Sequence, residues 1–283
     1  MGRYKKILAA IDGSESSMHA LQESFKFACN EKCWITVTSV VPPYVGDLAM
    51  VGVRDIMGSM RKPCEDALKK AEKMAREEGV LIKTVCEEGE IFERISDLAA
   101  AENCDLIVMG RRGLHRLERS LVGSVTARVI GYSQRDVLVV PRDTRVGFKR
   151  VLVATDGSRQ CGPAVEKAID FSKSYGGEII VVSIVDVPAE FYAEAPQVVE
   201  DLARKALGYV EEVKKQAGVS GVKAETFVKE GEAYQAIISI AKANDVNTIV
   251  LGSHGRTGLK RLLMGSVAEK VIGYAPCPVL VTR

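Results

Sequence analysis

Short apolar runs alternate with longer amphipathic stretches along the whole of this sequence. In the second half, VLVAT (151–155) and EIIVVSIV (178–185) are apolar at nearly every position, a pattern typical of strands buried on both faces of a parallel sheet. The stretch between them, 158–175, has the spacing of an amphipathic helix, with Ser158 as its expected cap and the glycine pair 176–177 as its stop. The pattern predicts a strand, a helix and a second strand parallel to the first.

The same alternation continues to the end of the second half and is also present in the first. Further strands are expected at 222–228, 247–252 and 278–282, with helices near 197–217, 232–244 and 265–274. In the first half the expected strands are 6–11, 34–41, 80–86, 105–110 and 137–140. Apolar strands that alternate with helices predict an open α/β fold, in which a mostly parallel sheet carries helices on both faces.

The two halves share their sequence motifs, which predicts a tandem duplication of one domain. ILAAIDGS (7–14) returns as VLVATDGS 144 residues later, and GRRGLHRLERSLVGS (110–124) returns as GSHGRTGLKRLLMGS (252–266). The polar segment 141–150, which contains a proline and a glycine, is the expected linker. A chain of 283 residues suits two domains of ordinary size, which we place at 1–142 and 149–283.

Composition narrows the class of protein. The chain is 47% hydrophobic and 27% charged with a formal net charge of +2, so a polyelectrolyte such as nucleic acid is not the expected partner. The apolar run in MGRYKKILAAIDGS stops at Asp12, too soon for a signal peptide, and no later stretch reaches the length of a membrane span. We therefore expect a globular, cytoplasmic protein that does not bind membranes.

The seven cysteines are scattered, and in the absence of a secretory signal they are expected to be reduced. Cys29 and Cys33 stand four residues apart and could form half of a metal site, but no second Cys or His pair has ligand spacing. No metal site is therefore predicted, and the thiols are expected to be buried or incidental. His19 and His115 are expected to be surface or helix residues.

Two kinds of residue mark the carboxyl ends of the expected strands. Asp12 and Asp156 directly follow the first strand of each half, and the glycine runs directly follow the fourth. Ligands of open parallel sheets bind at such ends, where the strand order reverses. A glycine lets the backbone approach a ligand closely, and Gly-Ser at the start of a helix offers free N–H groups and the positive helix end to an anion.

The glycine runs therefore indicate a phosphate site in each half. Basic residues between the glycines favour the same guest: Arg111, Arg112, Arg116 and Arg119 in the first run, and His254, Arg256, Lys260 and Arg261 in the second. Other phosphate loops are missing from the sequence, which has neither G-x-x-x-x-G-K-[ST] nor G-x-G-x-x-G. P-loop NTPases and ordinary dinucleotide-binding domains are thus not supported.

The motifs that are present resemble those of the universal stress protein family, here as a tandem of two domains covering about 1–142 and 149–283. They are D-G-S after the first strand, G-x₂-G-x₉-G-[ST] after the fourth, and a closing P-x-P-V-L-V strand. The resemblance implies five-stranded, Rossmann-like domains of the adenine nucleotide alpha hydrolase-like type. It also implies ATP as the ligand, with Mg²⁺ as an optional companion, held between the end of the first strand and the glycine loop.

The resemblance also implies which residues contact the nucleotide. In the second half these are Ala154, Thr155, Asp156 and Ile184 at the adenosine, and Gly252, His254, Gly255, Arg256, Gly265, Ser266 and Val267 around the phosphates. In the first half they are Ala10, Ile11, Asp12, Val40, Gly110, Arg112, Gly113, Gly123, Ser124 and Val125.

The two expected sites differ at two places. Ile11 stands where the second half has Thr155, which removes a hydroxyl beside the nucleotide, and Arg111-Arg112 replaces Ser253-His254, which adds charge and bulk. One neutral hydrogen bond is worth a few-fold to about tenfold in affinity, so we expect the second site to bind more tightly. The added arginines offset this at low salt, and the difference should grow as salt screens them.

The leading hypothesis is an ATP-binding stress or regulatory protein whose nucleotide occupancy controls a surface for a protein partner, with little or no hydrolysis. The Asp at the adenosine end is badly placed as a base for the γ-phosphate, and His254 is expected to donate a hydrogen bond to phosphate, so no catalytic residue is assigned. One alternative is an adenylating or slowly ATP-hydrolysing enzyme of the ATP pyrophosphatase type, whose S-G-G-x-D-S loop is missing here. Another is an assembly module without a ligand.

Strands 137–140 and 279–282 close their domains and are expected at sheet edges, which need covering. In single-domain relatives the closing strand commonly serves the dimer interface. The resemblance therefore implies that the two halves pair as an internal pseudo-dimer, and pairing of two chains into a homodimer is a further expectation.

In each half, the segment that follows the second strand has no clear pattern. They are 42–63, which contains Met50, Met57 and Met60, and its shorter, aromatic counterpart 187–196. Both are expected to line the core or to form a lid, with a partner-binding site as the alternative.

Overall fold

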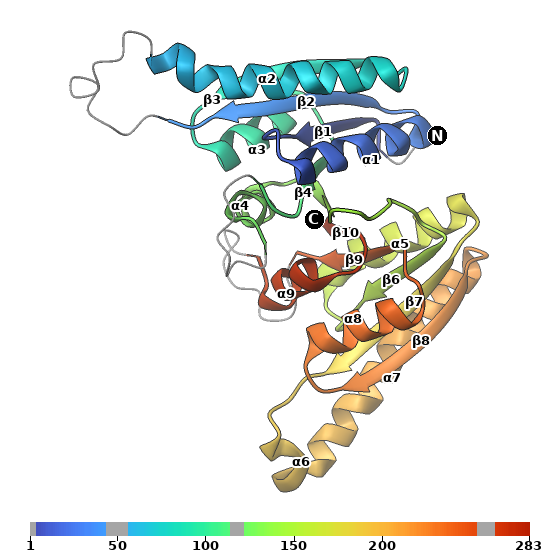
Figure 1. Cartoon of the computed structure of the whole chain (residues 1–283). Helices are drawn as coiled ribbons and strands as arrows, with labels where there is room; N and C mark the ends of the chain where they lie inside the picture. The colour runs from blue at the N-terminus through green and yellow to red at the C-terminus, as the bar shows by residue number, and fades with distance from the viewer. Residues whose placement is uncertain (1–3, 44–55, 114–121, 254–263) are drawn as a thin grey trace. The chain divides into compact units, whose positions relative to one another are not determined.

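The computed structural model describes residues 4–43, 56–113, 122–253 and 264–283. Internal contacts divide the chain into two compact units, Met1–Asp143 and Thr144–Arg283. Each unit has a central sheet with helices packed against both of its faces (Figure 1).

The described part of the first unit has a parallel sheet of five strands in the order β3-β2-β1-β4-β5. Helices α1 and α2 cover one face, and α3 and α4 cover the other. In chain order the elements are β1 (Lys6–Ala10), α1 (Glu15–Glu31), β2 (Trp34–Val41), α2 (Ile56–Glu77), β3 (Ile82–Glu88), α3 (Ile91–Ala101), β4 (Leu106–Gly110), α4 (Ser124–Tyr132) and β5 (Asp136–Val140).

The second unit repeats this plan over its described residues, with the parallel order β8-β7-β6-β9-β10. Helices α5 and α7 cover one face, and α8 and α9 cover the other. The elements are β6 (Arg150–Ala154), α5 (Gly162–Tyr175), β7 (Glu178–Val185), α6 (Glu190–Glu194), α7 (Pro196–Val219), β8 (Lys223–Glu230), α8 (Ala233–Ala243), β9 (Thr248–Gly252), α9 (Ser266–Tyr274) and β10 (Val279–Thr282). The predicted open α/β fold is confirmed in both units.

The cores are aliphatic because the central strands are covered on both faces. Ile7 of β1 lies beside Ile35 of β2 and Leu106 of β4, and Leu8 and Ile107 are fully buried as well. Burying one such side chain contributes about 1.5–3 kcal/mol. The continuous apolar runs in the sequence are therefore the signature of strands with no solvent-facing side.

The first helices of the two units begin differently. Ser14 caps α1, and its Oγ accepts a hydrogen bond from the backbone N–H of Ser17 at 3.2 Å. The prediction that Ser158 caps the corresponding helix is wrong, because a 3₁₀ turn at Arg159–Cys161 comes first and α5 starts at Gly162. Ser158 makes no side-chain cap bond there, and its backbone N–H donates instead to the Asp156 carboxylate at 2.9 Å.

Part of the expected linker is anchored in the second unit. Phe148 is buried and its ring stacks on Phe171 at a centroid distance of 4.0 Å. The hydroxyl of Thr248 donates to the carbonyl of Gly147 at 2.7 Å. The chain thus enters the second fold before β6 begins, and the boundaries at 142 and 149 stay a prediction.

The segments after β2 and β7 do not line the core throughout. Residues 44–55, with Met50, lie outside the described residues, and Met60 is on α2. In the other segment Val187 packs against the buried cluster of Val185, Val199 and Ala206, whereas α6 has no buried residue and Phe191 is 41% exposed, so core lining is wrong for α6 alone and a lid stays a prediction. The five-residue helix packs on α7.

An ion cluster joins elements at the amino ends of the first unit's strands. Glu102, just after α3, pairs with Lys6 of β1 and with Lys83 of β3, the latter at 2.7 Å. Hydrogen bonds from Lys6 and then Lys83 lower the pKa of Glu102 to about 2.

Candidate functional site

In each unit the strand order reverses between the first and the fourth strand. β1 lies between β2 and β4, and β6 lies between β7 and β9, so the helices that follow these neighbours cover opposite faces. Such a reversal leaves a crevice at the carboxyl ends of the two central strands. The structure has a cavity of about 460 Å³ there in the first unit and one of about 440 Å³ in the second.

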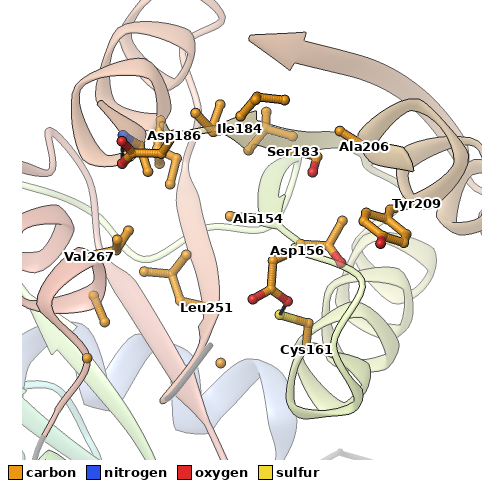
Figure 2. Close-up of a pocket in the computed structure, with 18 of the residues that line it drawn as sticks. Ala154, Asp156, Cys161, Ser183, Ile184, Asp186, Ala206, Tyr209, Leu251 and Val267 are labelled. Atoms are coloured by element: carbon orange, nitrogen blue, oxygen red, sulfur yellow. Dashed lines mark hydrogen bonds between the residues drawn. The ribbon is translucent and has the colours of Figure 1, made fainter. Parts of the chain in front are cut away.

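Residues from six elements surround the cavity of the second unit (Figure 2). They come from the ends of β6, β7 and β9, from one face of α7, and from the starts of α8 and α9. Among those labelled in the figure are Ala154 and Asp156, Ser183 and Ile184, Ala206 and Tyr209, and Val267. The structure therefore brings the predicted residues after β6, β7 and β9 to one place.

Asp156 is held in a fixed position at the cavity wall. Its Oδ1 accepts from the backbone N–H of Ser158 at 2.9 Å and lies 3.3 Å from the Sγ of Cys161 (Figure 2). Burial raises the pKa of the Cys161 thiol, so the sulfur keeps its proton and can donate it to the carboxylate. In the first unit Asp12 accepts from the N–H of Ser14 at 3.0 Å in the same way.

The residue before each aspartate is buried and belongs to the turn. The N–H groups of Ile11 and Thr155 donate to the carbonyls of Thr38 and Val182 at 2.8 and 2.9 Å. The hydroxyl of Thr155 accepts from the backbone N–H of Gly157 at 3.2 Å. The hydroxyl that distinguishes the second site thus already stabilises the turn with one of its two acceptor lone pairs, and its proton remains to be donated.

The second and seventh strands extend past their central neighbours. The β1–β2 pairing ends at Thr38 and the β6–β7 pairing ends at Val182, whereas β2 and β7 continue to Val41 and Val185 beside their other partners. The backbone at Val40 and Ile184 therefore borders the cavity on a side where no strand pairs with it.

At the opposite side of each cavity a helix begins without a side-chain cap. Gly123 and Gly265 are the N-cap residues of α4 and α9, and neither helix has a side-chain cap bond. The first N–H groups of a helix have no acceptor within it, and they carry the positive end of the helix dipole. Ser124 and Val125 in the first unit, and Ser266 and Val267 in the second, thus present an anion site to the cavities.

Among the described residues, a backbone hydrogen bond connects the two ends of each glycine run. The N–H of Gly123 donates to the carbonyl of Arg111 at 2.9 Å, and the N–H of Gly265 donates to that of Ser253 at 3.3 Å. These bonds hold the start of each helix beside the end of the preceding strand. The glycine at the helix start therefore has a fixed position relative to the strand end at the cavity.

The glycines of the first run have different neighbours. A Cβ on Gly110 would lie 2.6 Å from Oγ and 2.9 Å from the carbonyl carbon of Ser16, so glycine is required there by the start of α1. A Cβ on Gly113 would collide with the Asp12 carboxylate. A Cβ on Gly123 would meet nothing nearer than 3.4 Å, so the protein itself leaves room for a side chain at that position.

The glycine of each D-G-S turn is needed for its backbone conformation. Gly13 and Gly157 have φ of +80° and +75°, a region that side chains disfavour. Tyr209 of α7 lies directly over Gly157, where the first unit has only the Cβ of Ala67 at 3.5 Å from the corresponding position. The second cavity therefore has an aromatic wall that the first lacks.

Helix α2 forms one wall of the first cavity and carries a disulfide. Met60, Pro63 and Cys64 line the cavity, and Cys64 is bonded to Cys86 of β3 with a Cα–Cα distance of 6.3 Å. The expectation of reduced cysteines is therefore wrong for this pair. The two residues are 22 apart in sequence and meet because α2 packs on β3, which no local spacing reveals. Cys29, Cys33, Cys104, Cys161 and Cys277 are free.

The first cavity also has an arginine on its wall. Arg112 lines it and is exposed, while Arg111 is half-buried, and burial followed by the charge of Arg112 lowers the pKa of Arg111. In the second unit Ser253, at the place of Arg111, lines the cavity, and His254, at the place of Arg112, lies outside the described residues. The difference in charge between the two sites therefore stays a prediction.

Several predicted residues lie outside the described part of the chain. They are His254, Gly255 and Arg256 of the site, together with His115, Arg116, Arg119, Lys260 and Arg261.

Other residues line the cavities without having been predicted. The α7 face of Leu202, Ala206 and Tyr209 was missed, as were Cys161 and the α2 pair Pro63 and Cys64. The spacing of 202, 206 and 209 marks one face of a helix, but a helix face that lines a cavity looks like one that lines the core. Only the packing of the helix against the strand ends decides between them.

The matches to known proteins reflect the two repeated units. The model of the universal stress protein family matches residues 3–141 and 147–283. A universal stress protein of Methanocaldococcus jannaschii is 37% identical over 142 residues, which cover 48% of this chain and 82% of that protein. One from Mycolicibacterium smegmatis is 25% identical over 295 residues, covering 98% of this chain and 96% of the relative.

A solved structure has the same fold over both halves. The crystal structure of a universal stress protein from Archaeoglobus fulgidus superposes with a TM-score of 0.76 at 24% identity, covering 98% of this chain and 96% of that one. Within the described residues, no helix has both the length and the apolar character needed to cross a membrane.

Proposed function

The chain belongs to the universal stress protein family, and we propose that each of its two units binds ATP in the cavity at its strand-order reversal. One observation carries this proposal. In both units an uncapped helix start stands across the cavity from a fixed carboxylate and a stretch of strand backbone that pairs with no strand on the cavity side. These features suit the phosphates, the ribose and the base of a nucleotide respectively.

The phosphates belong at the helix start. The free N–H groups and the positive dipole end of α4 and α9 favour an anion. A Cβ on Gly123 would make only ordinary contacts with the backbone of Arg111 and Arg112, at 3.4 Å, so the packing of the protein itself does not require glycine there. Arg112 adds a cation to the first site, and Mg²⁺ would bind through the phosphate oxygens.

The adenosine belongs at the other end. A carboxylate such as Asp12 or Asp156 accepts hydrogen bonds from the hydroxyls of a ribose. The base would lie against apolar residues and beside the unpaired backbone of Val40 or Ile184, where N–H and C=O groups can pair with the edge of adenine. Tyr209 and Leu202 add apolar surface in the second unit.

We propose binding with little or no hydrolysis, so that occupancy itself is the signal to a protein partner. Hydrolysis needs a base that positions water at the γ-phosphate. Asp156 has fixed contacts to Ser158 and Cys161 and is assigned to the ribose rather than to that role. Pairing of the two halves through their closing strands, a homodimer and a cytoplasmic location stay predictions from the sequence.

The test is calorimetric titration of the full chain with Mg-ATP, with Mg-GTP and magnesium tripolyphosphate as comparators. Two ATP per chain, weaker GTP and weaker tripolyphosphate are expected, because the base is read by backbone groups and the phosphates are not the whole ligand. Tripolyphosphate binding as tightly as ATP would contradict a nucleoside site, and no heat with any of the three would remove the proposal. Release of pyrophosphate from ATP would show the adenylating alternative instead.

A further inference from the structure

The disulfide between Cys64 and Cys86 distinguishes the first cavity from the second. Met60 and Cys64 occupy the α2 wall where Leu202 and Ala206 occupy the α7 wall. The strand register places Cys86, four residues after Ile82, where β8 has Val228, four residues after Ala224.

At the corresponding place the second unit has an apolar contact. Ala206 is buried in a cluster with Val185 and Val199, and Val228 packs against that cluster. A covalent link therefore stands in one unit where van der Waals contacts suffice in the other. The same fold can close this wall without a disulfide, so the link is not needed to form the cavity.

We propose that Cys64–Cys86 is a thiol–disulfide exchange site whose oxidation state sets the affinity of the first cavity for its ligand. The proposal rests on ATP binding there. Its reaction partner is a dithiol/disulfide couple.

The exposures of the two sulfurs give the order of events. Cys64 is only 3% exposed, whereas Cys86 is half-buried and is the accessible end of the bond. A thiolate of the dithiol attacks the Cys86 sulfur, which forms a mixed disulfide and releases Cys64 as a thiolate that takes up a proton. The second thiol of the dithiol then attacks the dithiol's first sulfur, which is bonded to Cys86 in the mixed disulfide. Cys86 is released as a thiolate and takes up a proton, and the dithiol becomes a disulfide, oxidised by two electrons.

Reduction loosens the α2 wall. Two thiols need more room than a bonded pair of sulfurs, and Cys86 is held in the sheet, where it lies beside Ser39 of β2. The helix must therefore give way, and with it Met60, Pro63 and Cys64, which line the cavity. A ligand then has to order this wall when it binds, which we expect to lower its affinity about three- to tenfold.

The coupling is reciprocal. If forming the disulfide raises the affinity for ATP by some factor, then bound ATP raises the equilibrium constant for forming the disulfide by the same factor. The second cavity, with Ala206 and Val228, should show neither effect.

The experiment measures Mg-ATP binding to the full chain by calorimetry after equilibration with dithiothreitol or with its oxidised cyclic form. Asp156→Ala weakens the second site so that the first can be followed alone. The variant C64A/C86V carries the residues of the second unit, and Cys29→Ser, an exposed free thiol, is the matched control. Mass spectrometry of alkylated peptides reports which cysteines are linked.

We expect the first site to weaken about three- to tenfold on reduction, Cys29→Ser to keep this response and C64A/C86V to lose it. Equal affinities in the two redox states would overturn the inference and leave ATP binding intact. So would a response that persists in C64A/C86V, or peptides in which Cys64 and Cys86 never link. Absence of ATP binding in both redox states would contradict the proposed function itself.

Discussion

Replacing Gly110 and Gly123 by alanine, one at a time, separates packing from ligand binding in the first glycine run. A Cβ on Gly110 would lie 2.6–2.9 Å from atoms of Ser16, two of them backbone atoms that move only with α1. Overpacking of this kind typically costs about 1–3 kcal/mol. At about 2–4 °C per kcal/mol, Gly110→Ala should lower the unfolding temperature of the first unit by several degrees with no ligand present.

Gly123→Ala should behave differently. Its φ of −59° suits any residue, and the nearest atoms to the new Cβ are at 3.4 Å. Alanine gains about 0.4–1 kcal/mol by restricting the unfolded chain, and it loses a similar amount because glycine is the better N-cap. The two effects nearly cancel, so the stability of the free protein should hardly change. The methyl group would however occupy the side of the helix start where we place the phosphates, and affinity should fall at least about tenfold through lost backbone hydrogen bonds.

Scanning calorimetry of each variant with and without millimolar Mg-ATP checks both expectations. Wild type should gain stability on saturation, by about 2.7 kcal/mol at a hundredfold excess over Kd. Gly123→Ala should unfold like wild type without ATP and gain less with it, whereas Gly110→Ala should be destabilised in both conditions. The assignment of the open space at Gly123 to phosphate is refuted if Gly123→Ala binds ATP as well as wild type does.

Three further outcomes are expected. Removing the disulfide with C64A/C86V should destabilise the first unit by about 3 kcal/mol, the entropy of a loop of this length, and an unfolding midpoint in denaturant that does not move would contradict this. The depressed pKa of Glu102 means that its ion pairs stabilise the fold above the ordinary carboxyl pKa and are lost as pH falls toward about 2, so Glu102→Gln should flatten the acid limb of the stability curve. Asp156→Ala should remove more ATP binding than Asp12→Ala at physiological salt, with the difference shrinking at low salt; calorimetry that finds the tighter site lost in Asp12→Ala would reverse the order.

The sequence predicted what depends on short-range pattern. The strands were found because apolar residues on successive positions need two covering layers, and the D-G-S turns and glycine runs were found because both recur in the second half. Burial of both central strands follows from the same rule. These features are written within a few residues of one another, so one sequence suffices to identify them.

What the sequence did not predict depends on contacts between distant elements. The Cys64–Cys86 bond exists because α2 crosses β3, and Tyr209 lies over Gly157 because α7 passes above the turn after β6. The start of α5 was misplaced because a 3₁₀ turn at Arg159–Cys161 follows Ser158, although the bond from the N–H of Ser158 to Asp156 has a counterpart at Ser14, which does cap its helix.

The comparison of the two units explains why a nucleotide site could be inferred from the sequence, whereas the effect of the helix walls on its affinity could not. The groups assigned to the ligand are largely backbone: the first N–H groups of α4 and α9 and the strand edges at Val40 and Ile184. Backbone groups need only a few glycines and one aspartate to position them, and these are the residues that the two halves share. The helix walls have no such constraint, and there the halves differ, with Cys64 in one and Ala206 in the other. Redox control should therefore originate in the wall that α2 forms with β3, and exchanging Cys64 and Cys86 for Ala206 and Val228 between the units should move redox sensitivity from one site to the other without abolishing binding.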